Sequence, residues 1–265
     1  MLGWLKRRRL RRLAAELAPT DRELNQLIRR HHCLQRLDGG ERERLGRLAA
    51  EILATKQFHG AGGLRPDRGD CLAVAVHAAL PVLNLGLEPY RQFHTFILYR
   101  DAFAVEIEET DDDGLVHRGR DLRSGEAWQR GPVVLSLADV ADSGHGQGYH
   151  VVVHELAHQI DQLNGDADGY PPLPREIEHR DWVETFNQAW SAMLEDLEQG
   201  RDTALDPYAG ESPAEFLAVA CEAFFDTPEH LSAVLPDVYR LLARLFRQDP
   251  ADQEARLAGS RGRLN

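Results

Sequence analysis

One predicted helix constrains this chain more than any other segment of its sequence. In GYHVVVHELAHQIDQLNG a helical period of apolar residues begins at about Gln147. At 100° per residue these side chains form one stripe, made of Tyr149, Val152, Val153, Leu156, Ile160 and Leu163. His154, His158 and Asp161 lie roughly opposite the stripe, and Gly165 marks a typical C-terminal stop.

Two histidines one turn apart on the same helix face can reach a single metal ion. His154 and His158 have this spacing, and zinc accepts imidazole nitrogens at about 2.0–2.1 Å. Glu155 flanks the same face, where it can take a proton from the hydrolytic water without ligating the metal. The alternative is a pair of ordinary histidines on the polar side of an amphipathic helix. The opposed apolar stripe favours the zinc site.

A catalytic zinc ion takes three protein ligands and keeps one open position, so a third ligand must come from another segment. ESPAEFLAVACEAFF (211–225) predicts a helix with Ser212 as its cap and Pro213 at its first position. Glu215 and Glu222 share a face but lie about 10.5 Å apart along the axis, so we do not expect both to bind one ion. Glu215 also fits a capping box with Ser212. Spacing alone does not choose between the two carboxylates.

Several longer stretches resemble the Mlc titration factor A family of bacterial zinc peptidases, over about residues 20 to 250. They are LPVLNLGLE, EETDDDGLVH, SGEAWQRGPVVLS, VVVHELAHQIDQLNGD, DPYAGESPAEFLAVACEAFF and RLFRQDP. The resemblance implies Glu215, in the Pro-Ala-Glu segment, as the third metal ligand. It also implies a likeness to the catalytic domain of anthrax lethal factor, which has a tyrosine seven residues before its glutamate ligand. Tyr208 holds that position here, and the likeness implies that it stabilises the oxyanion.

The order of predicted elements favours an α+β fold, and the resemblance implies a zincin-like, gluzincin-like core. Helices are expected over 21–56, with a break at 38–40, and over about 71–86. Strands are expected over 93–99, 102–109 and 133–137, and helices over 181–197, 213–226 and 237–247. The segment 111–131 is polar and rich in turn residues. The strand PVVLS is expected to form the sheet edge that pairs with an extended peptide.

These predictions give a single metallopeptidase domain over 21–250. Its helical N-terminal part covers 21–90, and its catalytic core covers 91–250 and combines the His-Glu helix, the glutamate-bearing helix and a small mixed sheet. A basic segment (1–20) precedes the domain and a tail (251–265) follows it.

The expected function is hydrolysis of peptide bonds with one Zn²⁺ per chain, and the resemblance implies an aminopeptidase for short substrates. Its peptide substrate would need an anchor for the free N-terminus, which the sequence does not identify. The resemblance also implies a second hypothesis, a regulatory protein that binds a transcriptional repressor of the Mlc type and so controls sugar uptake. A third is a structural zinc site, but a closed site has no use for the general base Glu155.

Charge and cysteine content limit the partners and the compartment. The chain has 43 acidic and 31 basic residues, and six of the basic ones lie between Lys6 and Arg12. The remainder is strongly acidic, so we expect no direct nucleic-acid binding. No apolar run reaches the roughly 18–20 residues of a membrane span. Cys33, Cys71 and Cys221 are too widely spaced for a disulfide framework or a cysteine zinc site, which favours a reducing cytoplasm.

Overall fold

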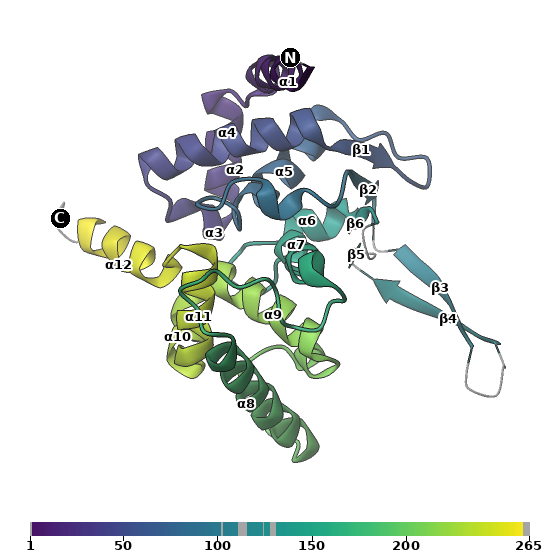
Figure 1. Ribbon diagram of the computed structural model, residues 1–265, viewed down its shortest axis with the longest axis vertical. Helices are drawn as coiled ribbons and strands as arrows, with labels where there is room; N and C mark the ends of the chain where they lie inside the picture. Colours follow the sequence, from purple (N-terminus) through teal and green to yellow (C-terminus); the bar gives the residue numbers. More distant parts are fainter. Residues whose placement is uncertain (1, 102, 111–115, 124, 128–130, 262–265) are drawn as a thin grey trace.

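The chain folds into a mostly helical structure with a small mixed sheet (Figure 1). The computed structural model describes residues 2–101, 103–110, 116–123, 125–127 and 131–261. Its helices are α1 (Leu2–Leu17), α2 (Asp21–Arg30), α3 (His32–Gln35), α4 (Gly39–Thr55), α5 (Arg68–Ala79), α6 (Leu137–Asp142), α7 (Val151–Asp161), α8 (His179–Glu198), α9 (Pro213–Asp226), α10 (Pro228–Val234), α11 (Pro236–Phe246) and α12 (Pro250–Arg261). The short 3₁₀ turns are η1 (Glu88–Tyr90), η2 (Gln162–Asn164) and η3 (Pro207–Gly210).

The main sheet has four strands in the order β1-β2-β6-β5. Its strands are β1 (Gln57–Gly60), β2 (Thr95–Tyr99), β5 (Gly125–Ala127) and β6 (Val133–Ser136). The first three neighbours, β1, β2 and β6, run parallel, and β5 pairs antiparallel with β6. A separate antiparallel hairpin of β3 (Phe103–Thr110) and β4 (Val116–Arg123) extends away from the helices (Figure 1).

The strand containing Val133–Ser136 is not at the sheet edge, so that prediction is wrong. Strand β6 pairs with β2 on one side and β5 on the other. All four of its residues are buried, as expected for an internal strand. The outer positions belong to β1 and to the three-residue strand β5. The sequence prediction failed because a short apolar run indicates burial but not the position of a strand in the sheet.

Several shorter elements were also missing from the sequence prediction. The polar segment 111–131 contains β4 and β5, and its residues 111–115, 124 and 128–130 lie outside the described part of the chain. Strand β1 lies between two expected helices, where no strand was predicted, and α6 and α10 had no predicted counterpart. The expected C-terminal tail forms α12 up to Arg261. These elements are short or polar, so hydrophobic periodicity gives little signal for them.

Capping residues explain why the N-terminal helices begin where they do. Thr20, Asp38 and Asp67 each accept a backbone N–H bond at the start of α2, α4 and α5, and each is part of a reciprocal capping box. Such caps satisfy amide groups that have no partner within the helix. Asp38 lies at the predicted interruption between the first helices.

Helix α7 lies at the centre of the molecule and not on its surface. It packs against α5 on one side, α9 on another, and strands β5 and β6 (Figure 1). Ten of its eleven residues are buried, including the charged Glu155 and Asp161. The expected polar side of this helix therefore faces other parts of the protein. Among the described residues, no helix combines the length and the apolar character that crossing a membrane requires.

Candidate metal centre

Helix α7 brings its two histidines together on one face. It begins at Val151, four residues after the predicted start, because the preceding glycines have left-handed backbone angles, with φ of +81° at Gly146 and +79° at Gly148. The Nε2 atoms of His154 and His158 are 3.2 Å apart. The predicted helical spacing is thus present in the structure.

Helix α9 supplies the carboxylate that faces these histidines. Ser212 caps the helix by accepting the N–H of Glu215 at 3.1 Å, and Pro213 occupies the first turn, as the sequence predicts. The Glu215 side chain does not complete a capping box with Ser212. Its Oε2 lies 3.0 Å from Nε2 of His154 and 3.4 Å from Nε2 of His158.

The three atoms form a group that fits one metal ion. Ligand atoms from His154, His158 and Glu215 all lie within 4.8 Å of one another. Ligands about 2.0–2.1 Å from a tetrahedral zinc ion are about 3.3 Å apart, close to the 3.0–3.4 Å separations observed here. Oε2 of Glu215 is buried and accepts no hydrogen bond of good geometry. The three atoms carry lone pairs that converge on one point, and one of them is a buried oxygen without a hydrogen bond of good geometry. Such a group suits a cation.

Glu222 has a different place in the site from Glu215. Its Oε1 lies 2.8 Å from Nδ1 of His154, and its Oε2 accepts the backbone N–H of His150 at 2.5 Å. A carboxylate at Nδ1 holds the proton on that nitrogen and leaves the Nε2 lone pair facing Glu215. The geometry therefore separates the two carboxylates that spacing alone could not distinguish.

The electrostatic environment of His154 favours a positive charge. Burial lowers the pKa of His154, but the carboxylates of Glu215 and Glu222 outweigh burial and raise that pKa well above its ordinary value. Burial conversely raises the pKa of Glu215, and the two histidines reverse this and hold it below its ordinary value. A proton and a metal cation are both stabilised by such a field.

A cleft of about 640 Å³ opens beside this group. His154, Glu155 and Tyr208 line it, so the predicted base and the predicted oxyanion-stabilising residue face the same space as a predicted ligand. Glu155 is 3% exposed and comes from α7, whereas Tyr208 comes from η3 and is 44% exposed. The Tyr208 ring centroid lies 6.0 Å from that of His154. The volume is that of a typical small-molecule or short-peptide site.

Asp161 connects α7 to the start of α9. It is fully buried, and its Oδ2 accepts the N–H of Gly169 at 2.7 Å. Burial raises the pKa of Asp161 to about 6. Gly169 has φ of +82°, and a Cβ atom at this position would lie 2.6 Å from the carbonyl oxygen of Pro213. Only glycine fits there, so the loop after α7 lies directly against the first turn that carries Glu215.

Asp226 holds the loop before α7 and was missed by the sequence analysis. Its carboxylate accepts the N–H groups of Gly146, Gln147 and Gly148 at 2.8–2.9 Å. Consecutive amides that converge on one anion need left-handed positions in the loop, which the glycines provide. The alternating glycines of SGHGQGY were the sequence signal for such a loop.

Comparison with known proteins gives the class of protein to which this site belongs. The chain is a member of the family described as glucose-regulated metallo-peptidase M90, which matches residues 4–247. Similar proteins include those named Mlc titration factor A from three bacteria. The Pectobacterium atrosepticum protein is 37% identical over 233 residues, which are 86% of each chain. The Serratia proteamaculans protein is 38% identical over 228 residues, 84% of this chain and 86% of the relative. The Escherichia coli protein is 37% identical over 214 residues, 79% and 80%.

Proposed function

We propose that this metallopeptidase is a zinc-dependent peptidase with a zincin-like core and one catalytic zinc ion per chain. His154, His158 and Glu215 would hold the ion. The observation that carries the proposal is the convergence of their three side-chain atoms at 3.0–3.4 Å beside a cleft. Two nitrogens and one carboxylate oxygen are a typical ligand set for a catalytic zinc ion. Mg²⁺ and Ca²⁺ prefer oxygen ligands, so the two imidazoles favour zinc.

The other residues of the site would each have a separate role in the hydrolysis. A bound zinc ion supplies Lewis acidity, which lowers the pKa of water to about 7 and polarises a carbonyl group. Glu155 would accept the proton of the attacking water and transfer it to the leaving amine. The Tyr208 hydroxyl would donate a hydrogen bond to the developing oxyanion. Glu222 would keep the His154 ring in the orientation and tautomer that present Nε2.

We further propose that the substrates are short peptides with a free N-terminus. The cleft volume suits a few residues, and the family of the chain is a peptidase family. A comparison of one peptide with a free and an acetylated N-terminus tests this specificity. Faster hydrolysis of the free form is expected for an aminopeptidase, and equal rates would contradict it.

Glu155→Gln is the test of the mechanism. The variant should bind zinc as the parent does, because Glu155 is not one of the three converging ligands, and it should lose hydrolysis by at least 100-fold. Metal content and peptide turnover are the measurements. Glu211→Gln is the matched control, since Glu211 is exposed and does not line the cleft. Turnover within tenfold of the parent would remove Glu155 from the proposed role.

The names of the relatives favour a second function for the chain. Those proteins are named as titration factors for Mlc. We propose that this chain also binds a transcriptional repressor of that type in the cytoplasm, as part of the control of sugar uptake. Capture of a purified repressor of this type by Glu155→Gln at parental affinity is expected, because binding needs no hydrolysis. Loss of capture in that variant alone would contradict an independent binding function.

A further inference from the structure

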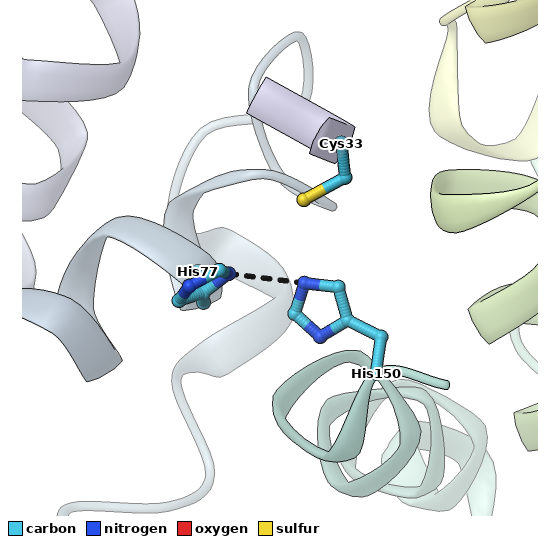
Figure 2. A group of neighbouring side chains, drawn as sticks. All are labelled: Cys33, His77 and His150. Atoms are coloured by element: carbon cyan, nitrogen blue, oxygen red, sulfur yellow. Dashed lines mark hydrogen bonds between the residues drawn. The ribbon is translucent and has the colours of Figure 1, made fainter. Parts of the chain in front are cut away.

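A second group of metal-binding side chains lies in the interior, away from the cleft. It consists of Cys33 on α3, His77 on α5 and His150, the residue that caps α7. All three residues are completely buried. Figure 2 shows the sulfur atom and the two imidazole rings pointing toward one shared space. The three ligand atoms lie within 4.8 Å of one another.

We propose that Cys33, His77 and His150 form a second, structural site for a zinc-like divalent ion. One thiolate and two imidazoles are ligands that zinc accepts and that magnesium and calcium do not prefer. Nδ1 of His77 and Nε2 of His150 are 3.0 Å apart, near the roughly 3.3 Å expected for two nitrogens on one tetrahedral ion. All three ligand residues are buried, whereas the proposed catalytic site lies beside a cleft, and burial away from a cleft favours a structural role.

The protonation state of the two histidines suits metal binding. Burial and the neighbouring imidazoles lower the pKa of His77, and burial lowers the pKa of His150 to about 3, so both rings are neutral. Burial raises the pKa of the Cys33 thiol to about 12, so the ion must displace a proton to bind sulfur.

Metal binding would change one contact at the start of α7. Nδ1 of His150 now accepts the N–H of Val153 at 3.3 Å, so the ring proton lies on Nε2 and points to His77. Binding through Nε2 moves that proton to Nδ1 and ends the contact with Val153. Two other anchors remain, because Val151 N–H donates to Ser143 Oγ at 3.0 Å and His150 N–H donates to Glu222.

A second ion would connect parts of the fold that are distant in sequence. It would join α3, α5 and the residue that caps α7, three positions that are distant in sequence. His150 N–H contacts the same Glu222 carboxylate that holds His154. The second ion would thereby fix the end of the helix that carries the proposed catalytic ligands. No spacing motif predicts such a site, because residues 33, 77 and 150 lie far apart along the chain.

Metal content of the full chain tests the proposal. After chelation and reloading with Zn²⁺, the parent should hold two ions per chain and Cys33→Ser should hold one. His150→Asn should also hold one, and since asparagine is a good helix cap, this variant keeps α7 capped. Cys71→Ser is the matched control, because Cys71 is a half-buried cysteine of α5 outside the group, and it should hold two. A parent with one ion, or a Cys33→Ser variant with two, would overturn the second site.

Cobalt absorption separates this site from the proposed catalytic one. Reloaded with Co²⁺ alone, Glu215→Ala should still show the near-ultraviolet band of a cobalt–thiolate bond, because its Cys33 is intact. Adding Cys33→Ser to this variant should abolish the band. A Glu215→Ala protein without the band contradicts the second site and leaves the catalytic proposal standing. If Cys33→Ser holds fewer ions than the parent and Glu215→Ala holds as many as the parent, the catalytic proposal is contradicted instead.

Discussion

At the scale of single residues, Glu222 is the residue of the candidate centre whose two contacts require a carboxylate. One oxygen contacts the His154 ring and the other accepts the N–H of His150. A carboxamide cannot satisfy both, because one of its two ends is a donor. Glu222→Gln is therefore expected to weaken zinc binding by about 10- to 100-fold, the usual effect of losing a partner behind a metal-binding histidine.

Competition with a chromogenic chelator measures this change in zinc affinity. Glu229→Gln removes an exposed carboxylate from α10 and serves as the control, with an affinity equal to that of the parent. If Glu222→Gln also binds zinc as the parent does, the carboxylate does not support His154 in the way proposed here.

The sequence identifies only part of this residue-level arrangement. The spacing of His154 and His158 within one helix places both rings on one face, and the structure has them there. Spacing within α9 could not choose between Glu215 and Glu222, because the choice depends on how α9 crosses α7. That crossing is set by side chains packed from both helices. Periodicity within one helix carries no information about it.

At the scale of elements, the long apolar helices were predictable and the short connections were not. Helices α8, α9 and α11 lie within a few residues of their predicted bounds, because many apolar positions repeat at helical spacing. Strand β5 has only three residues and α6 only six, so neither shows a period. The register of β6 against β2 pairs residues that lie far apart in the chain, such as Phe96 and Val133.

A single buried carboxylate binds three amide groups of the loop before α7. Asp226 is 1% exposed and accepts three amide N–H groups of that loop. Asp226→Ala leaves these donors without their acceptor and should lower the free energy of unfolding by about 3–5 kcal/mol. Urea denaturation measures this loss.

Two further variants make the loop experiment specific. Asp226→Asn keeps one acceptor oxygen and should cost less than the alanine variant. Asp142→Ala removes an exposed carboxylate near the start of the same loop and should change stability by no more than about 0.5 kcal/mol. Equal stability of the Asp226→Ala and Asp142→Ala variants would show that the three hydrogen bonds to Asp226 contribute nothing to the free energy of unfolding.

At the scale of the whole molecule, the candidate centre joins two helices that are separated by about 50 residues of chain. His154 and His158 come from α7, Glu215 comes from α9, and the two helices also pack by apolar contacts. Their apolar surfaces and the bonds of Glu222 and Asp226 do not depend on a metal ion. The fold should therefore survive loss of the ion from this centre, at reduced stability.

Thermal unfolding with and without zinc measures this contribution. At free zinc a hundredfold above its Kd, binding to the folded state stabilises it by about 2.7 kcal/mol. For a chain of this size, that corresponds to a Tm increase of about 5–10 °C. Glu155→Gln should show the full increase, because the base is not a ligand. Glu215→Ala should lose the part of the increase that belongs to this centre, since an alanine offers no lone pair to the ion. An undiminished zinc-dependent shift in Glu215→Ala would mean that zinc stabilises the molecule from somewhere other than the α7–α9 crossing.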